Sequence, residues 1–202
     1  MPQVVLASGN PGKIKEFSEL LAPLDLEILP QSLFDTPEAE ETGLSFVENA
    51  ILKARNAAEH SQRPALADDS GLEVDALNGA PGIYSARYAG EHATDALNNQ
   101  KLLEALKDIP AHKRTARFRC VLVYLRHAND PSPVIAEGTW EGCVSHSLEG
   151  EQGFGYDPLF YIPALKCTAA QLLPAEKRQY SHRSQALQRL LETLKKNHPL
   201  KP

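Results

Sequence analysis

A short apolar run that ends in two adjacent carboxylates constrains the fold of this chain more than any other stretch. Pro64–Ala67 is followed directly by Asp68-Asp69 and then by the turn-forming pair Ser70-Gly71. An apolar run closed by such a turn predicts a buried strand that ends at a loop. Ligand crevices in α/β sheets form at strand ends, and neighbouring carboxylates disfavour each other's ionisation unless a cation or a reaction needs them. A plain surface turn is the alternative, because Asp, Ser and Gly all favour turns.

The composition is that of an ordinary globular protein. The chain has 202 residues, of which 42% are hydrophobic, and a formal charge of −5. This length predicts a single domain, residues 1–202, with room for two lobes and a sizeable core. The acidic balance argues against nucleic acid as the main partner. A polyphosphate site would therefore have to be a local basic cluster within an acidic protein.

The cysteines and the apolar runs indicate a cytoplasmic protein. Cys120, Cys143 and Cys167 are odd in number and scattered without CxxC spacing, which is typical of reduced thiols and not of disulfides or zinc ligands. The N-terminus lacks a signal pattern, and no apolar stretch approaches the length needed to span a membrane. We therefore expect neither a membrane nor nucleic acid as a partner.

The first strand is followed by a glycine-containing loop and a helix. Val4–Ala7 predicts a buried strand, and Ser8-Gly9-Asn10-Pro11-Gly12-Lys13 leads into an amphipathic helix that ends near Pro23. Such a loop presents free backbone N–H groups and a positive dipole end to an anion, and Lys13 adds a charge there. It is not a Walker A loop, because Ile14 stands where a Ser or Thr would bind magnesium. A tight connector is the alternative.

Acidic residues precede the next long helix. Glu40 and Glu41 lie just before Thr42-Gly43, and Ser45 and Glu48 have capping-box spacing. The acidic residues could simply compensate the helix dipole. Alternatively, one of them is a hard oxygen ligand for magnesium, opposite Asp69. The apolar face of this helix is predicted to contain Leu44, Val47, Ile51, Ala54, Ala57 and Ala58.

Lys53 is four residues after Asn49, so both lie on one face of that helix. Lys53 is either a solvated surface lysine or a second phosphate-binding group.

The middle of the chain predicts a helix and a long hairpin. Thr94 caps a helix with Leu97, Leu102, Leu103 and Leu106 on its apolar face. The strands at 116–127 and 134–147 then form a hairpin with Asn129–Pro131 in its turn, and we expect this hairpin to form a second lobe. Gly138 and Gly142 predict a bulge or bend in its second strand.

Two later stretches have the residue types of a ligand site. In Gly153–Asp157, two glycines flank Phe154 and allow backbone to approach a flat ligand, on which Phe154 could stack. A glycine-rich hairpin loop is the alternative. His182 and Arg183 begin the last helix, against the dipole's preference for acidic residues. The pair therefore either faces an acceptor or anion, or is solvated.

Seven blocks together resemble the inosine triphosphate pyrophosphatase family, within it the bacterial dITP/XTP branch, along nearly the whole chain. The blocks are Ser8-Gly9-Asn10-x-x-Lys13, Glu40–Gly43, Glu48–Ala50, Ala67–Gly71, Gly82–Arg87, Phe154–Pro158 and Ser181–Arg183. The one small departure is Ser8 where Thr is frequent, and Ser keeps the hydroxyl. The resemblance implies a mixed α/β fold with a long curved central sheet flanked by helices, two lobes with the active cleft between them, and a homodimer.

The resemblance also implies an activity and a set of site residues. The activity is Mg²⁺-dependent hydrolysis of ITP, dITP and XTP to the monophosphate and pyrophosphate. Asp69 is the implied proton acceptor and, with the Glu40/Glu41 position, a metal ligand; we favour Glu41. Phosphate binding falls on Ser8, Gly9, Asn10, Pro11, Gly12 and Lys13, and base and sugar contacts on Ser70, Phe154, Gly155, Tyr156, Asp157, Lys177, His182 and Arg183.

The residue types suit this chemistry. Lys13, Lys53 and Mg²⁺ would offset the charge of a leaving pyrophosphate. Asp69 would position the attacking water and take its proton, with Asp68 as an alternative for one of these roles. A donor on Arg183 or His182 would favour the C6 carbonyl of hypoxanthine or xanthine over the amino group of adenine. A non-catalytic nucleotide sensor and a pyrophosphatase for other modified nucleotides are the competing hypotheses.

Overall fold

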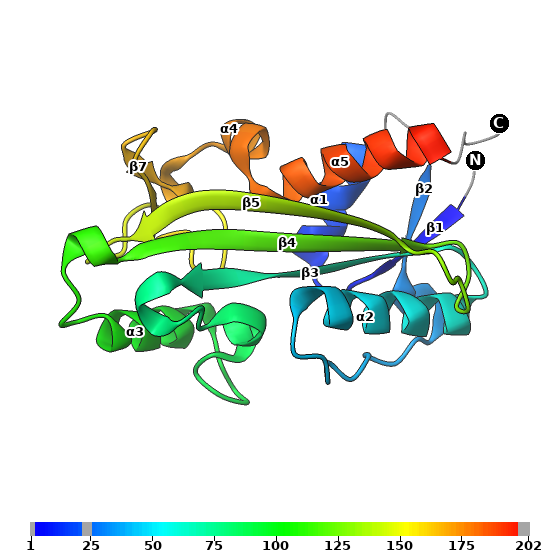
Figure 1. Cartoon of the computed structure of the whole chain (residues 1–202), viewed down its shortest axis with the longest axis horizontal. Coiled ribbons are helices and arrows are strands. Elements are labelled where there is room, and N and C mark those ends of the chain that lie inside the picture. The colour runs from blue at the N-terminus through cyan, green and yellow to red at the C-terminus, as the bar shows by residue number, and fades with distance from the viewer. Residues whose placement is uncertain (1–2, 22–25, 198–202) are drawn as a thin grey trace. The chain divides into compact units, whose positions relative to one another are not determined.

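The computed structural model describes residues 3–21 and 26–197, without the side chains of Pro11, Leu20 and Asn197. Its strands form one seven-stranded sheet in the order β2-β1-β3-β4-β5-β6-β7 (Figure 1). Parallel pairs, such as β1 with β3, and antiparallel pairs, such as β5 with β6, both occur. The strands are β1 Gln3–Ala7, β2 Glu27–Pro30, β3 Ala65–Val74, β4 Thr115–Leu125, β5 Val134–Val144, β6 Phe160–Ile162 and β7 Cys167–Thr168.

Within the described part of the chain, five α-helices flank this sheet: α1 Pro11–Leu21, α2 Phe46–Ser61, α3 Asp95–Ala105, α4 Pro174–Tyr180 and α5 His182–Asn197. The predicted mixed α/β fold, with helices flanking a central sheet, is confirmed. The structure describes no helix long and apolar enough to cross a membrane.

The chain divides into two compact units. The first unit comprises Met1–Asp69, Cys120–Glu137 and Gln185–Pro202, and the second comprises Ser70–Arg119 and Gly138–Ser184. Strands β3, β4 and β5 each contain residues of both units. That the whole chain is one domain, with a cleft between two lobes, stays a prediction.

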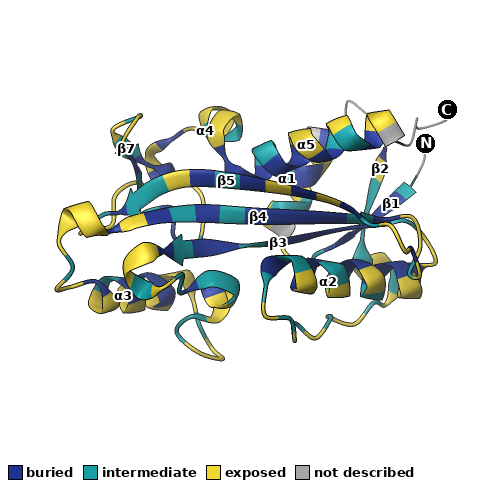
Figure 2. Ribbon diagram, in the orientation of Figure 1, coloured by how far each residue is buried: buried dark blue, intermediate teal, exposed yellow. Residues whose placement is uncertain are grey.

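The core of the first unit lies between its strands and helices α1 and α5. Phe17 of α1 is fully buried, and Leu190 of α5 and Leu6 of β1 belong to the same cluster. Helix α2 covers the opposite face of these strands with its alanine-rich stripe, which is buried in Figure 2. Small side chains on α2 let it lie close to the sheet.

The start of α2 follows the predicted capping pattern. The hydroxyl of Ser45 accepts a hydrogen bond from the Glu48 N–H, and the Glu48 carboxylate accepts from the Leu44 N–H and the Ser45 hydroxyl. These bonds satisfy donors that a helix start leaves open, and they hold the pKa of Glu48 below its usual value. Leu44 itself is exposed, so it does not belong to the apolar face as predicted.

Aromatic rings fill the core of the second unit. Phe160 contacts Phe118 and Trp140, with ring centroids 4.5 and 5.4 Å apart. Leu102 and Leu106 pack against this cluster as predicted. Leu97 is largely exposed, because it lies on the outer side of α3.

The end of α3 is held by a buried arginine. Arg114 donates to the carbonyl oxygens of Leu106, Ile109 and Ser145 at 2.6, 2.9 and 3.1 Å. Carbonyl oxygens at the end of a helix lack partners within the helix, so Arg114 fixes this end of α3 to the rest of the second unit.

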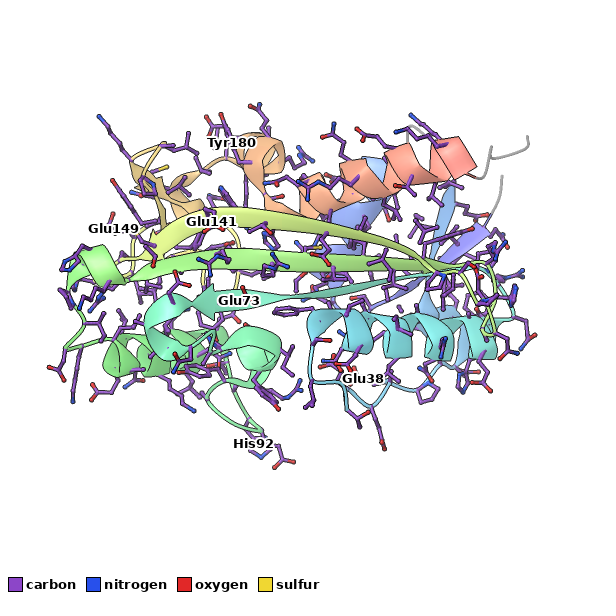
Figure 3. The ribbon with its side chains drawn as sticks, viewed as in Figure 1. Glu38, Glu73, His92, Glu141, Glu149 and Tyr180 are labelled. Atoms are coloured by element: carbon purple, nitrogen blue, oxygen red, sulfur yellow. The ribbon has the colours of Figure 1, made fainter. Side chains whose placement is uncertain are left out.

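A second arginine links neighbouring strands on the surface of the same unit. Arg117 lies 2.7 Å from an Asp75 oxygen and 3.0 Å from a Glu141 oxygen, with Glu73 at 4.0 Å. Figure 3 labels Glu73 on β3 and Glu141 on β5, the neighbours of β4. The Arg117 and Thr115 bonds lower the pKa of Asp75 to about 2.

Two predictions about the strands were wrong. Asp68-Asp69-Ser70-Gly71 is not a turn, because β3 continues through these residues to Val74. The hairpin of β4 and β5 has the predicted turn but does not form a second lobe, since Cys120–Glu137 belongs to the first unit.

The predicted bulge or bend at Gly138 and Gly142 stays a prediction, because β5 runs through both residues and a strand can bend without ending. Gly142 allows close packing, since a Cβ there would lie 2.6 Å from the Phe160 ring. Pro23, the predicted helix end, lies outside the described residues.

Candidate active site

The loop between β1 and α1 is closed by its own side chains. The Asn10 side-chain oxygen accepts from the N–H groups of Gly12 and Lys13 at 2.9 and 3.2 Å, and the Ser8 hydroxyl accepts from the Asn10 N–H at 3.1 Å. The expectation of free N–H groups therefore fails at Gly12 and Lys13. Asn10 occupies the position at the helix start that an anion would take.

On the other side of this loop, Gly9 lies near Glu38, which precedes α2 and is labelled in Figure 3. A Cβ at Gly9 would lie 3.7 Å from an oxygen of Glu38, an ordinary van der Waals contact, so this packing does not require glycine. Gly9 and Asn10 are exposed, so the predicted phosphate loop faces solvent.

Lys13 reaches from α1 to the carboxylate pair on β3. Its Nζ lies 2.9 Å from Oδ1 of Asp68, whose side chain is fully buried. The Cys120 thiol lies 3.9 Å from the other Asp68 oxygen. A buried carboxylate needs such a partner to remain ionised.

Lys53 bridges the two segments that were predicted to share a cation. Its Nζ lies 2.6 Å from Oδ1 of Asp69 and 2.7 Å from Oε1 of Glu41. Lys53 is therefore not a solvated surface lysine. Glu41 and Asp69 lie 28 positions apart in the chain and converge on one ammonium group. We call Glu41, Asp68 and Asp69 the acid cluster.

Asn49, one helical turn before Lys53, has a structural contact. Its side-chain oxygen accepts from the Gly43 N–H at 2.9 Å, and a Cβ at Gly43 would lie 2.7 Å from that oxygen. Asn49 thereby ties the segment that carries Glu41 to α2, where Lys53 lies.

Burial and the neighbouring opposite charge shift the pKa of Asp69, and likewise that of Lys53, in opposite directions. Burial raises the pKa of Asp69, Lys53 lowers it in part, and repulsion from Glu41 and Asp68 raises it further, so the pKa stays above its usual value. Burial alone would lower the pKa of Lys53, but its pairs with Asp69 and Glu41 outweigh burial and raise it. Asp69 is thus a stronger base than a solvated aspartate, and Lys53 remains a cation.

Glu41 and Asp69 present carboxylate oxygens, the ligand type that Mg²⁺ prefers. Oδ2 of Asp69 is buried without a hydrogen-bond partner among the described residues, while Oδ1 and Glu41 already hold a cationic group. Mg²⁺ is commonly bound by one or two carboxylates together with substrate phosphates. The described residues contain no group of three or more His, Cys, Asp or Glu side chains placed to hold a metal. Glu40 is exposed, so Glu41 has the better placed carboxylate.

In the second unit, Phe154 is exposed in a loop whose last two residues are buried. We call residues 153–157 the aromatic loop. Phe154 is 44% exposed, whereas Tyr156 and Asp157 are buried. The Phe154 N–H and the Lys177 ammonium both donate to Oδ2 of Asp157, which leaves no space for a Cβ at Gly153. Tyr156 packs in the core and its hydroxyl donates to the Ser85 carbonyl.

Two cations lie over the exposed Phe154 ring. Lys177 Nζ is 5.3 Å and Arg183 Cζ 5.9 Å from the ring centroid. His182 stacks on Phe118 at a centroid distance of 4.8 Å, and both His182 and Arg183 are buried. The His-Arg pair is therefore not solvated. The aromatic loop, Lys177 and the start of α5 come together as expected.

Two sets of contacts in the site were missed from the sequence. The Lys13–Asp68 pair joins two predicted residues, but nothing in their spacing indicated the contact. Asp95 and Asn99 on α3 hydrogen-bond the backbone of Gly155. Their i, i+4 spacing was visible, but it gave no sign of which loop they contact. Ser70 is half-buried on β3, directly after Asp69.

Comparison with known proteins gives relatives over almost the entire chain. The model of the Ham1 family matches residues 4–193. A protein named dITP/XTP pyrophosphatase from Thioalkalivibrio sulfidiphilus is 65% identical over 192 residues, which cover 95% of this chain and 98% of the relative. A protein with the same name from Photorhabdus laumondii is 58% identical over 96% of this chain and 99% of its own length.

Solved structures show the same fold. A Ham1 protein from Coxiella burnetii has a TM-score of 0.92 and 51% identity, covering 97% of this chain and 100% of its own. The Ham1 protein of Staphylococcus aureus has a TM-score of 0.86 and 44% identity, covering 96% and 98%.

The fold and side chains define a mixed α/β protein with a lysine-bridged acid cluster in one unit and a cation-lined aromatic loop in the other. The chain belongs to the Ham1 family. This confirms the resemblance drawn from the seven sequence blocks.

Proposed function

We propose that the chain hydrolyses non-standard purine nucleoside triphosphates, namely ITP, dITP and XTP, to the monophosphate and pyrophosphate. The observation that carries this proposal is the single ammonium of Lys53 held between Glu41 and Asp69. A cluster of this kind suits phosphoryl chemistry, in which catalysis depends on positioning and charge. Relatives of up to 65% identity named dITP/XTP pyrophosphatase support it.

The two lysines supply the charge that a triphosphate needs. Lys13 pairs with Asp68, and Lys53 pairs with Asp69 and Glu41. A triphosphate offers both ammonium groups new oxygen partners where the leaving pyrophosphate forms. In this proposal, the ammonium groups of Lys13 and Lys53 bind phosphate oxygens of the substrate.

Asp69 is the proton acceptor in this proposal. Water attacks the α-phosphorus, its proton passes to an Asp69 oxygen, and the bond between the α-phosphorus and the bridging oxygen breaks to release pyrophosphate. Burial raises the pKa of Asp69 and so strengthens it as a base. Oδ1 shares a cation with Glu41, whereas Oδ2 is buried without a partner among the described residues. We assign proton transfer to Oδ2 and cation binding to Oδ1.

Glu41 and Asp69 would hold the expected Mg²⁺. The ion would supply charge stabilisation for the phosphates and acidify the attacking water. The pairing of both carboxylates with one ammonium group supports this assignment.

The second unit would recognise the base. Phe154 offers an exposed ring for stacking. Arg183, a cation close to that ring, has donors that suit the C6 carbonyl of hypoxanthine or xanthine. The amino group of adenine would face those donors with another donor, and a buried mismatch of this kind can discriminate by roughly 10⁴-fold.

A panel of triphosphates tests the proposal. Purified chain is incubated with ITP, dITP, XTP, dGTP and ATP, with Mg²⁺ or with EDTA, and pyrophosphate and monophosphate are measured. We expect release of both products from the first three substrates, and none with EDTA. Tight binding of ITP without release would indicate a sensor. Faster hydrolysis of another modified nucleotide would indicate a different pyrophosphatase.

Two further expectations belong to this proposal. A homodimer, implied by the resemblance, can be tested by sedimentation equilibrium. A cytoplasmic location is supported by three free cysteines, of which Cys120 is buried. A fluorescent fusion expressed in bacterial cells would test that location.

A further inference from the structure

We infer that Asp95 and Asn99 are positioning residues for base recognition, because together they clamp the peptide groups of Gly155 in the aromatic loop. The inference rests on the proposed function and goes further, since it assigns a specificity role to two side chains of α3. Neither residue belongs to the base-contacting stretches inferred from the sequence.

The clamp consists of two hydrogen bonds of opposite polarity. Oδ2 of Asp95 accepts from the Gly155 N–H at 2.7 Å. Nδ2 of Asn99 donates to the Gly155 carbonyl oxygen at 2.8 Å and also to the Asp95 carbonyl oxygen at 2.8 Å. Residues four apart on a helix project to the same side. One turn of α3 therefore fixes both the donor and the acceptor of a single loop residue.

Gly155 is the point where the loop needs such support. Its φ is +64°, in the left-handed region, yet a Cβ there would meet no atom within 4 Å. The space beside its Cα is open, and glycine's backbone is the most permissive of all residues. The two hydrogen bonds from α3, together with the 3.3 Å bond from the Asp157 N–H to the Phe154 carbonyl oxygen, therefore hold the conformation that the peptide adopts.

The same loop carries the exposed ring. Phe154 directly precedes Gly155, and its own N–H is held by Asp157, while the Tyr156 hydroxyl is held by the Ser85 carbonyl. Because the peptide groups of Gly155 and the N–H of Phe154 are all hydrogen-bonded, the backbone is fixed both before and after Phe154 in the chain. A ring that is 44% exposed is thus presented by a backbone with little freedom to move, as pre-organised recognition of a flat base requires.

Asn99 has a feature that structural support alone would not require. It is 4% exposed, and its side-chain oxygen is buried without a hydrogen-bond partner among the described residues. A buried acceptor without a partner is unfavourable. The residue is placed for the two bonds that Nδ2 donates, one of which fixes the loop.

The neighbouring residue provides a matched control. Asn98 is 3% exposed and also lies on α3, but it accepts from the Ala89 N–H and donates to the Ala86 carbonyl. Replacing either asparagine by alanine removes two buried hydrogen bonds. Only Asn99→Ala releases Gly155.

The test compares KM and kcat for ITP and ATP in wild-type protein, Asn99→Ala, Asp95→Leu, Asp95→Asn and Asn98→Ala, with melting temperatures measured in parallel. We expect Asn99→Ala and Asp95→Leu each to raise the KM for ITP about tenfold, the effect of losing one net hydrogen bond, with little change in kcat. In the same two variants, the ratio of kcat/KM for ITP to kcat/KM for ATP should fall. Asp95→Asn keeps an acceptor oxygen and should remain within about twofold of wild type.

The outcomes separate this inference from the proposed function. Wild-type protein that does not prefer ITP to ATP overturns the proposed function and the inference with it. A wild-type preference that both Asn99→Ala and Asp95→Leu leave intact overturns the inference alone. An equal rise of KM in Asn98→Ala also overturns it, because the effect would then be general loosening of α3. Asp95 is exposed, so Asp95→Leu gives an answer even if Asn99→Ala does not fold.

Discussion

Asp69 lies where burial and a neighbouring cation act on its pKa in opposite directions. Burial raises the pKa, Lys53 lowers it, and Glu41 and Asp68 raise it again. An ordinary aspartate is a weak base at neutral pH. The surroundings of Asp69 make it stronger while keeping it paired with a cation, as a residue that must accept a proton beside a polyanion requires.

Asp69→Asn should therefore lose turnover but keep nucleotide binding. The amide has nearly the same shape and can still accept from Lys53, but it cannot take a proton. General-base catalysis contributes about 10² to 10⁴-fold, so we expect a loss of that order in kcat. Pyrophosphate release measures kcat, and calorimetric titration with ITP measures binding. Release near the wild-type rate would contradict the assignment of Asp69 as the base.

Lys53 occupies the space between two carboxylates that are expected to hold a divalent ion. If Mg²⁺ binds there as proposed, it would compete with the Lys53 ammonium for Oε1 of Glu41 and Oδ1 of Asp69. We predict that Lys53→Met raises the affinity of the nucleotide-free protein for Mg²⁺ and lowers kcat for ITP. Removing the competing ammonium should raise the affinity for Mg²⁺. Losing a positive charge near the phosphates should lower kcat.

Titration of nucleotide-free protein with Mn²⁺, followed by electron paramagnetic resonance, measures the first effect. Lys107→Met is the control, since Lys107 is exposed and pairs only locally with Glu104. Unchanged or weaker Mn²⁺ binding in Lys53→Met would show that the ammonium and the metal do not share those oxygens.

Arg183 is expected to contribute donors to base recognition. Arg183→Ala should narrow the difference in kcat/KM between ITP and ATP, because removing the donor removes the mismatch with adenine. Steady-state kinetics with both nucleotides measure the ratio. If the ratio stays at its wild-type value, Arg183 does not select the base, whatever happens to the absolute rates.

At the scale of elements, the turn between β4 and β5 is held by one buried carboxylate. Asp130 accepts from the backbone N–H groups of Arg126 and Ser132, both at 3.0 Å, and from the Arg126 guanidinium. These bonds lower the pKa of Asp130 well below its ordinary value of 3.8. The predicted turn at 129–131 thus owes its geometry to a residue that sequence analysis had treated only as a turn former.

Asp130→Asn should destabilise the protein by about 1.5–3 kcal/mol at pH 7, the range for hydrogen bonds to a charged group. Because the folded pKa is depressed, this contribution is complete above pH 3.8 and is lost as pH falls further. The stability difference between variant and wild type should therefore narrow at pH 3. Urea unfolding at pH 7, 5 and 3 measures it, with Asp108→Asn as an exposed control. A difference that stays constant down to pH 3 would contradict the role of the charge.

Helix starts could be predicted because their signals are local. Ser45 and Glu48 form the expected capping contacts, and the Thr94 hydroxyl accepts from the Leu97 N–H at the start of α3. The path of β3 could not be predicted, because Asp-Asp-Ser-Gly has strong turn propensity and only the neighbouring strands override it. A local sequence pattern contains no information about which strands pair across the sheet.

The same limit applies to the site. The spacing of Lys53 on α2 was visible, but its partners Glu41 and Asp69 come from an irregular loop and a strand, whose register has no periodic signal. The side-chain bonds that close the loop at Gly12 and Lys13 were missed for a related reason, since capping by Asn10 depends on the rotamer. Sequence analysis identified the residue types, and tertiary structure determined their pairing.

At the scale of the whole molecule, two cores share three strands. Phe17 belongs to the core of the first unit and Phe160 to that of the second. Strands β3, β4 and β5 contribute residues to both clusters, such as Leu66 and Leu72 of β3. Melting one core would require part of each shared strand to separate from its neighbours, so we expect the two units to unfold together.

Trp140 makes this expectation measurable. It is the single tryptophan of the chain and lies in the core of the second unit, 5.4 Å from Phe160 between ring centroids. Phe17→Ala and Phe160→Ala each remove a fully buried ring and should cost about 3–5 kcal/mol. Phe17→Ala, although it lies in the first unit, should lower the midpoint reported by Trp140 fluorescence about as much as the midpoint from circular dichroism. Two separate transitions, with Trp140 insensitive to Phe17→Ala, would show that the units unfold independently and that the shared strands do not couple them.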